Sequence, residues 1–575
     1  MLIGLTGRLL AAHKGAVLAI VALQLIQTMA TLLLPTLNAA IIDNGIVGGD
    51  VPQIVDLGSW MAVTAGVQVV AAVAAGYFGA VVAMELGRTL REELFAKVQS
   101  MSSQELTAFG AASLVTRTTN DVTQVQNLVV LVFTMLVAAP AIFLGGIALA
   151  VHQDIVLSGI VIVVVPVLAV IMVLIVRRLI PLYRQGQGLI DRISRVLREQ
   201  IIGASVIRGF GRQGHEERRF DGANKELTHN NLRSALLVAG MMPMIMLVVN
   251  LASVGVVWFG GHRIQSGDMR LGALTAFIAY ILQILIAIMM AMYVFMTAPR
   301  AAACAERIQA VLDTTPAVTD GPGVGGPGGN TVEYRNVSFA YPGAEQSVLH
   351  GVTFTAAPGT VTAIIGATGT GKSTLLNLLP RFLDASGGAV SIGGCDVRSL
   401  SLRTLRSLVA VVPQHSYLFS GTIAGNLRMA APAATDADLW RVLGIAQAEE
   451  FVRKSPQGLH SPVSQGGTNF SGGQRQRLCI ARALLREAAV YLFDDSFSAL
   501  DYGTDYRLRE ALQPLLRTAT VLVVAERVAT IMDAGLILVL EDGRVVAQGT
   551  HQQLMASSPS YREIAASQLV LEESP

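Results

Sequence analysis

The stretch VTAIIGATGTGKSTLLNLL, residues 361–379, decides the fold of the second half of the chain. It runs from a strand-like segment through a glycine-rich turn into a helical pattern. Gly366, Gly369 and Gly371 allow backbone N–H groups to surround phosphate oxygens at the beginning of a helix. We therefore expect Lys372 to reach the β- and γ-phosphates of a nucleotide, and Ser373 to bind Mg²⁺.

The whole turn is the predicted phosphate-binding loop. Its members are Gly366, Ala367, Thr368, Gly369, Thr370, Gly371, Lys372, Ser373 and Thr374. A lone glycine-rich match occurs by chance, whereas a match bounded by the correct strand and helix is a strong signal.

Short β-rich runs alternate with helical patterns from Thr331 onward. The runs are VTAIIG (361–366), LVAVVPQ (408–414), VYLFDD (490–495), TVLVVAE (520–526) and LILVLEDG (536–543). This alternation predicts an α/β domain with a mainly parallel core sheet over residues 331–575.

The first half of the chain is apolar. Of 575 residues, 52% are hydrophobic and only 14% are charged, whereas soluble domains carry about 25% charged residues. Six apolar stretches are long enough to cross a bilayer as helices, which takes about 20 residues each. They are residues 15–42, 57–84, 127–151, 154–177, 235–260 and 271–298. Residues 1–312 are therefore predicted to form an all-α domain of six transmembrane helices.

A Pro/Gly tract, DTTPAVTDGPGVGGPGGN at residues 313–330, separates the two halves. Such a tract forms neither helix nor strand and predicts a flexible linker.

Charge and cysteine content exclude other classes of protein. The net charge of +2 comes without a basic run, so nucleic acid is not an expected partner. Cys304, Cys395 and Cys479 are far apart and have neither a metal-ligand spacing nor the density of a disulfide framework.

Loop charges predict the orientation in the membrane. Lys and Arg gather between the second and third spans and between the fourth and fifth, whereas the first loop holds Asp43, Asp50 and Asp56 without a basic residue. The positive-inside rule places the two basic loops and both termini in the cytoplasm. These loops are helical in pattern, so the spans are expected to continue well beyond the bilayer.

Further motifs stand in a fixed order around the phosphate loop. They are Tyr341 in VSFAYPG, Gln414 in VVPQHSYLF, Ser471, Gly472, Gly473 and Gln474 in NFSGGQRQR, Asp494 in VYLFDD and Asp501 at the end of SALD. In this order they resemble the motifs of ATP-binding-cassette (ABC) transporters. With six preceding spans, the resemblance covers essentially the whole chain and is that of an exporter-type half-transporter. It is most similar to one half of bacterial, especially actinobacterial, two-gene multidrug-type exporters.

The resemblance implies a role for each motif. Tyr341 stacks on the adenine of ATP, Asp494 binds Mg²⁺, and Gln414 senses Mg²⁺ and the attacking water. The SGGQ signature completes an ATP site built on another chain's phosphate loop, and Asp501 belongs to a loop that crosses the dimer.

Two catalytic positions depart from the family pattern. Asp495 stands where the family has a Glu that polarises the attacking water. Its carboxylate is one methylene shorter, and an error of about 1 Å in a near-attack geometry costs about 10²-fold. Glu526 stands where the family has a His that contacts the γ-phosphate, and a carboxylate there repels phosphate. We therefore predict a site that binds nucleotide and hydrolyses it poorly.

The intact signature predicts a partner. A homodimer of this chain has two impaired sites, whereas a heterodimer with a homologous chain that carries the Glu and the His has one competent site. By resemblance, the stretches SQELTAFGAASLVTRTTND (103–121) and SVIRGFGRQGHEERRF (205–220) contain the helices that couple the two domains. The second stretch is expected to dock into the partner's nucleotide domain.

The spans favour a hydrophobic or amphipathic substrate, because they contain almost no ionisable residues. Methionines gather in two of them, at Met241, Met242, Met244, Met246, Met289, Met290, Met292 and Met296. Flexible thioethers suit varied apolar ligands, although bundle packing is the commoner use. An importer on an exporter-type fold and a nucleotide-gated regulatory protein remain alternatives, since fold alone does not set the direction of transport.

Overall fold

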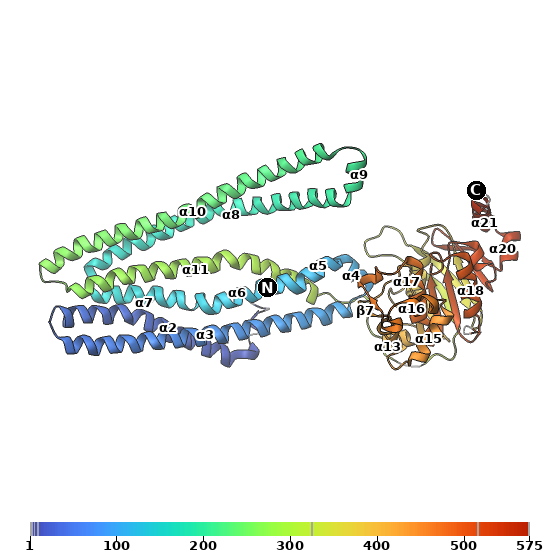
Figure 1. Ribbon diagram of the computed structural model, residues 1–575, viewed down its shortest axis with the longest axis horizontal. Helices are drawn as coiled ribbons and strands as arrows, with labels where there is room; N and C mark the ends of the chain where they lie inside the picture. Colours follow the sequence, from blue (N-terminus) through green and yellow to red (C-terminus); the bar gives the residue numbers. More distant parts are fainter. Residues whose placement is uncertain (1–3, 5, 9–10, 324–325, 515–516, 573–575) are drawn as a thin grey trace. The chain divides into compact units, whose positions relative to one another are not determined.

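The computed structural model describes residues 4, 6–8, 11–323, 326–514 and 517–572. They form two units, both drawn in Figure 1. The first unit comprises Met1–Lys97 and Ala112–Asp313, and the second comprises Val98–Ala111 and Thr314–Pro575. Sequence reasoning placed residues 98–111 with the membrane helices, whereas in the structure they group with the second unit. One hydrogen bond that joins this segment to the second unit runs from the N–H of Ala317 to Glu105.

The first unit is a bundle of long helices. Its elements are η1 (Ala11–His13), α2 (Lys14–Ala40), η2 (Ile41–Ile46), α3 (Val51–Ser100), α5 (Ala111–Thr116), η3 (Arg117–Asp121), α6 (Val122–Leu131), η4 (Val132–Leu136), α7 (Ala138–Gln153), α8 (Ile155–Ile202), α9 (Ala204–Gly209), α10 (Gln213–Gln265) and α11 (Leu271–Leu312). The elements η2, η3 and η4 are π-helical turns inside longer helical stretches. The last residues of α3 belong to the second unit.

The six predicted spans are confirmed within the described residues. Six helical stretches are long and apolar enough to cross a membrane: Lys14–Ile46, Val51–Ser100, Ala111–Gln153, Ile155–Ile202, Gln213–Gln265 and Leu271–Leu312. Three of these helices contain 50, 48 and 53 residues, far more than the about 20 residues that a bilayer crossing needs. They therefore continue beyond the spans, as the helical pattern of the loops predicts.

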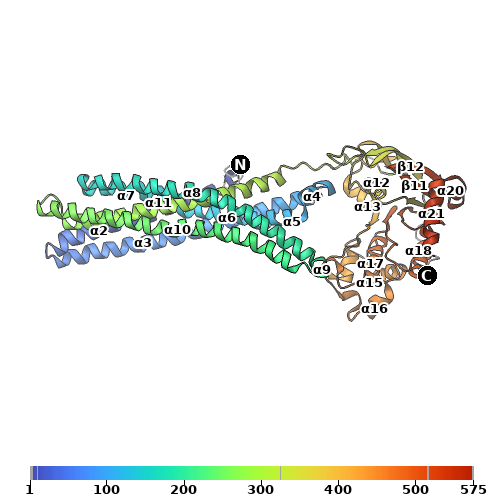
Figure 2. The same cartoon turned by 90° about the horizontal axis from the view of Figure 1, so that it is seen from above.

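Packing within the bundle centres on two groups of helices. α8 and α10 lie side by side and are joined by α9, as Figures 1 and 2 show. α11 packs against α2, α6 and α7, and its Tyr280 is fully buried with its hydroxyl 2.6 Å from the Thr36 hydroxyl of α2. Asp154 caps α8 by accepting a hydrogen bond from the N–H of Leu157 and also pairs with Arg263 at 3.0 Å.

The second unit is built on a six-stranded sheet of order β12-β11-β3-β10-β9-β6. Its strands are β3 (Val361–Ile365), β6 (Val409–Val412), β9 (Val490–Asp494), β10 (Thr520–Val524), β11 (Leu536–Glu541) and β12 (Arg544–Gly549). The first five run parallel, and only β12 is antiparallel. These five parallel strands are the five runs that the sequence predicted.

Two apolar cores cover the two faces of this sheet. Alternate residues of one strand face opposite sides, so Ile364 lies in one core whereas Ala363 and Ile365 lie in the other. A four-stranded sheet of order β2-β1-β4-β5 packs on the first core. Its strands are β1 (Val332–Phe339), β2 (Leu349–Ala356), β4 (Gly387–Ile392) and β5 (Cys395–Asp396), and a third sheet pairs β7 (Gly421–Thr422) with β8 (Pro462–Val463).

Helices make up most of the remaining regular structure of the second unit. The helices are α4 (Ser103–Phe109), α12 (Lys372–Leu378), α13 (Leu402–Leu408), α14 (Ile423–Arg428), α15 (Asp436–Ile445), α16 (Glu449–Lys454), η5 (Gly458–His460), η6 (Gln465–Gly467), α17 (Gly472–Leu484), α18 (Tyr502–Leu512), α19 (Val528–Ile531), α20 (His551–Ser557) and α21 (Pro559–Glu572). In parallel α/β sheets, ligands bind beyond the carboxyl ends of the strands. That edge carries the segments that follow β3, β6, β9 and β10.

Candidate nucleotide-binding site

The phosphate loop joins the end of β3 to the beginning of α12. Gly369 and Gly371 adopt φ values of 86° and 96°, which side chains rarely tolerate. A Cβ at Gly366 would collide with the carbonyl oxygen of Leu540. These glycines are therefore required by the shape of the loop, which presents its backbone at the N-terminus of α12, where phosphates bind.

The other loop residues hold this shape or face solvent. Thr370 donates a 2.9 Å hydrogen bond to the carbonyl oxygen of Ala367, whereas Ala367 and Thr368 are exposed. Lys372 folds back over the loop and donates to the carbonyl oxygens of Gly366 and Ala367 at 2.8 and 2.7 Å. Its ammonium group thus lies over the predicted phosphate cradle.

Ser373 and Asp494 form the predicted metal pair. Ser373 Oγ donates to Asp494 Oδ1 at 2.8 Å. Oxygen donors of this kind suit Mg²⁺, which is usually held by few protein ligands together with substrate phosphates. The described residues contain no cluster of three His, Cys, Asp or Glu able to hold a metal ion. The hydroxyl and carboxylate oxygens of Ser373 and Asp494 fit Mg²⁺ that is bound together with a nucleotide.

Burial shifts the pKa values of Asp494 and of the neighbouring Lys372. Burial raises the pKa of Asp494, although the Ser373 hydrogen bond and the charges of Lys372 and His415 oppose the shift. Burial lowers the pKa of Lys372, opposed by the negative charges of Glu526, Asp495 and Asp494 in that order. Glu526 is thus the carboxylate with the largest electrostatic effect on the phosphate-loop lysine.

Tyr341 lies beside α12, where an adenine-stacking residue is expected. Its hydroxyl is 3.3 Å from Thr374 Oγ1, and the edge of its ring packs against Phe339 with ring centroids 4.9 Å apart. Tyr341 is 41% exposed, so part of its side chain is accessible to a ligand. This arrangement also places Thr374 next to the nucleotide's predicted position.

Asp495 follows β9 in a strained conformation. Its φ is 46°, and its N–H donates to the carbonyl oxygen of Val524 at 3.0 Å. Its side chain accepts a 2.9 Å hydrogen bond from Ser498 Oγ. Burial raises the pKa of Asp495, the Ser498 hydrogen bond opposes this shift, and the charges of Glu526 and Asp494 add to it.

Glu526 is exposed in the segment between β10 and α19, and the backbone of this segment is fixed by Gln568 of α21. The Gln568 amide donates to the carbonyl oxygen of Glu526 and accepts from the N–H of Val528, each at 2.7 Å. Nothing in the sequence pattern singled out Gln568, because a glutamine near a chain end has no recognisable spacing.

The signature forms the first turn of α17. Ser471 and Gln474 make a reciprocal capping box, in which each side chain bonds the other's backbone N–H. Gly473 packs close to the carbonyl oxygen of Ala499, with an added Cβ at 3.1 Å, while Ser471 and Gly472 are exposed. The signature is therefore ordered and open at the surface.

Asp501 and Gln414 lie on loops beside the site. Asp501 caps α18 by accepting a 3.0 Å hydrogen bond from the N–H of Thr504, and that interaction lowers its pKa. Gln414 is exposed after β6. The adjacent His415 acts electrostatically on Asp494, a relationship that sequence reasoning missed although His415 directly follows the glutamine it did select.

Six membrane helices joined to a phosphate-loop unit with an ordered signature helix define an ATP-driven membrane transporter. Two family models match the chain: "ABC transporter transmembrane region" over residues 17–289 and "ABC transporter" over residues 349–498. The chain belongs to the ABC transporter family. It is an exporter-type half-transporter that binds ATP with Mg²⁺, and it is a multi-pass membrane protein.

Similarity to other proteins extends over the whole chain. An uncharacterized ABC transporter ATP-binding protein of Mycobacterium tuberculosis is 44% identical, with 99% of this chain and 98% of that protein covered. An ATP-dependent lipid A-core flippase of Chromobacterium violaceum is 32% identical, with 84% and 82% covered. A solved bacterial Atm1-family ABC exporter with ATP bound has the same fold, with a TM-score of 0.81 at 24% identity and coverage of 97% and 99%.

Proposed function

We propose that this chain is the degenerate subunit of a heterodimeric ABC exporter that moves a hydrophobic or amphipathic compound across the cytoplasmic membrane. In this proposal residues 1–312 form the transmembrane domain, 313–330 the linker and 331–575 the nucleotide-binding domain. Both termini lie in the cytoplasm. The observation that carries the proposal is the pair of carboxylates, Asp495 and Glu526, at the two positions that hydrolysis depends on.

The environment of Asp495 supports poor catalysis. A general base must reach the water it activates within hydrogen-bond distance. The short Asp495 side chain already accepts a hydrogen bond from Ser498. Glu526 places an acidic side chain where the family has a His, and its charge acts on Lys372. The same charge competes with the γ-phosphate for this lysine.

The intact signature supports a distinct partner. Ser471 caps α17 and is exposed, so the signature is accessible to complete an ATP site on another chain. In the first unit, apolar side chains at the α8–α9 turn are also exposed: Ile201, Ile202, Val206 and Phe210. Such exposed apolar clusters are typical of interaction surfaces, and by family resemblance this turn docks into the partner's nucleotide domain.

The substrate class follows from the spans and the relatives. Gln283 donates to the backbone carbonyl of Thr31 at 3.0 Å and so links α11 to α2, whereas Met244 and Met246 of α10 are more than half exposed. Mainly apolar spans provide no counter-ion for a strongly charged substrate. The relatives named lipid A-core flippases support a lipid or a similarly amphipathic drug.

ATP hydrolysis in lipid nanodiscs tests the proposal. We compare this chain alone with this chain co-purified with a homologous half-transporter that carries Glu and His at the two positions. The proposal predicts weak hydrolysis alone and robust, substrate-stimulated hydrolysis in the pair. A pair no more active than the single chain would contradict it, and nucleotide-dependent conductance without directional flux would favour a gated regulatory protein instead.

A further inference from the structure

The linker is seated on the nucleotide-binding unit rather than free. Val318 is 7% exposed, and the N–H of Gly323 donates to the carbonyl oxygen of Ser399 at 3.1 Å. A Cβ at Gly321 would collide with the carbonyl oxygens of Leu400 and Arg398. The prediction of a flexible linker is therefore wrong for residues 314–323, where Gly321 permits close packing.

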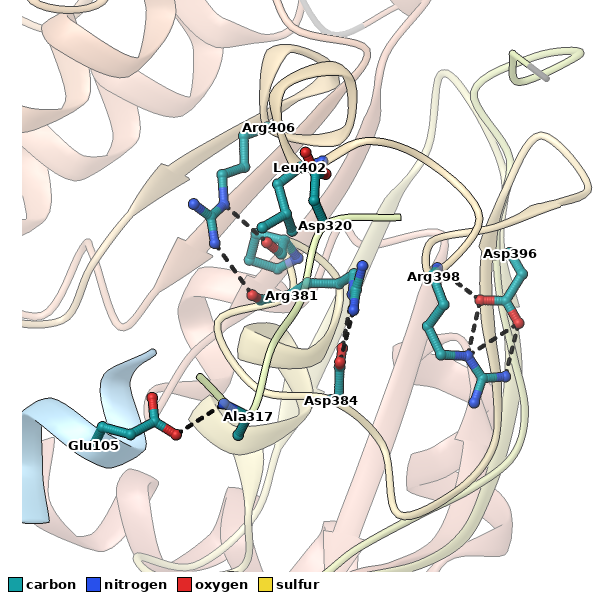
Figure 3. A network of polar contacts seen from close by, with 10 residues as sticks. Glu105, Ala317, Asp320, Arg381, Asp384, Asp396, Arg398, Leu402 and Arg406 are labelled. Atoms are coloured by element: carbon teal, nitrogen blue, oxygen red, sulfur yellow. Dashed lines mark hydrogen bonds and ion pairs between the residues drawn. The ribbon is translucent and has the colours of Figure 1, made fainter. Parts of the chain in front are cut away.

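Two carboxylates, Glu105 of α4 and Asp320 of the segment itself, form hydrogen bonds that hold residues 314–323 in place, as Figure 3 shows. Glu105 of α4 accepts a hydrogen bond from the N–H of Ala317 at 3.0 Å. Asp320 accepts one from the N–H of Leu402, at the beginning of α13, at 2.6 Å. Carboxylate acceptors form hydrogen bonds roughly twice as strong as neutral ones.

Glu105 serves two elements at once. Its other oxygen accepts a 2.6 Å hydrogen bond from the N–H of Ser102, which completes the capping box of α4. Burial opposes ionisation of this carboxylate, but the hydrogen bonds from Ser102 and Ala317 together outweigh burial and lower its pKa. Glu105 is therefore ionised at neutral pH and holds both bonds.

The other end of the segment leads to the phosphate-loop helix. Arg406 of α13 reaches the carbonyl oxygens of Pro380 and Arg381, just after α12, at the long distances of 3.5 and 3.4 Å. Arg381 is 4% exposed and pairs with Asp384 through two hydrogen bonds of 2.8 and 2.7 Å. The segment after α12 thus holds a buried ion pair next to the two carbonyl groups that Arg406 of α13 contacts.

We propose that residues 314–323 are a strap that transmits the nucleotide state of the phosphate-loop helix to α4, with Glu105 and Asp320 as its positioning residues. The route runs from α12 through Arg406 and α13 to Asp320, along the strap to Ala317, and then to Glu105. α4 follows α3 in the chain after only two residues, so a shift of α4 reaches a membrane helix directly. The strap works in either a homodimer or a heterodimer.

Hydrogen exchange of the full chain in lipid nanodiscs, with and without Mg²⁺ and ATP, tests the strap. In the unmodified chain, ATP is expected to slow exchange both at residues 361–379 and at residues 98–111. Asp320→Ala should keep the first response and reduce the second about tenfold, the factor that loss of one charge-assisted hydrogen bond supplies. Gly321→Ala should act in the same way by displacing the strap without changing any charge.

Two variants separate transmission from simple stability. Asp320→Asn retains an acceptor oxygen and should restore the response of residues 98–111. Ser102→Ala weakens the cap of α4 but leaves the strap bonds, so it should raise exchange in α4 with and without ATP and preserve the ATP-dependent difference. The strap is refuted if Asp320→Ala leaves the response at 98–111 unchanged. Loss of the response at 361–379 as well would also refute it, because Asp320 would then be needed for nucleotide binding itself.

Discussion

Ser373 Oγ donates a 2.8 Å hydrogen bond to Asp494 Oδ1, which joins the first turn of α12 to the end of β9. One residue comes from the phosphate loop and the other from a strand more than a hundred residues later. The parallel sheet brings both to the same edge, since β3 and β9 each pair with β10. The phosphate and metal parts of the site are thus held by one rigid element.

Replacement of Ser373 should weaken binding of Mg²⁺ with ATP. Ser373→Ala removes one of the two oxygens of the pair. Loss of an outer-shell partner alone costs about 10–100-fold in metal affinity, so loss of a ligand oxygen should cost at least as much. Titration of the nanodisc-embedded chain with Mg²⁺ at fixed fluorescent ATP analogue measures the change. Ser498→Ala is the matched control, because its hydroxyl bonds Asp495 rather than Asp494, and an equal loss in both variants would contradict this role.

The same pair predicts a pH dependence. Burial raises the pKa of Asp494 above its ordinary value of 3.8, so the folded protein takes up this proton at a higher pH than the unfolded chain does. Its contribution to stability is present below pH 3.8 and is lost as pH rises through the raised pKa. The affinity for Mg²⁺ should fall as the pH is lowered, because protonation of Asp494 removes the negative charge that attracts the metal ion. Titrations with Mg²⁺ at several pH values measure this dependence, and Asp494→Asn should abolish it. Mg²⁺ binding that weakens only below pH 3.8 would contradict the raised pKa of Asp494.

Breaking a buried ion pair in the first unit should destabilise the protein. Asp121 is fully buried and accepts two hydrogen bonds from Arg307 of α11, at 2.8 and 2.6 Å. Arg307→Ala removes both hydrogen bonds from the buried carboxylate and leaves Arg117 as the cation that acts on it, which should cost about 2–3 kcal/mol of unfolding free energy.

Denaturant unfolding in detergent measures the loss, with Arg300→Ala as a control on the same helix. Arg300 is exposed, so its replacement should change stability by less than about 0.5 kcal/mol. Adding Asp121→Asn to Arg307→Ala should recover part of the loss. Equal stability of the two arginine variants would mean that water replaces the guanidinium at Asp121.

The elements that the sequence predicts correctly are those with a clear hydrophobic pattern or a fixed motif. The five parallel strands and the phosphate loop were identified, because buried strands read as continuous apolar runs and the loop needs glycines at set positions. The six spans were identified because a bilayer demands length and apolarity together.

The linker was misread because composition does not reveal contacts. A glycine in a sequence can indicate either a flexible segment or a tightly packed one. At Gly321 the carbonyl oxygen of Leu400 lies so close that only a glycine fits, and this contact cannot be recognised from composition. Gln568 was missed for a related reason, since its two bonds to the Glu526–Val528 segment are long-range. Such pairings depend on how distant elements fold together.

Under the proposed function, Asp495 and Glu526 disable hydrolysis in this chain's own site. The most direct test is the ATPase rate of the lone chain in nanodiscs, compared with the same chain carrying Asp495→Glu and Glu526→His. We predict a rate near background for the unmodified chain and a gain of about 10²-fold in the double variant, the scale of a 1 Å correction in catalytic geometry. Fast hydrolysis by the unmodified chain, with no gain in the variant, would show that Asp495 is a competent base and would contradict the claim.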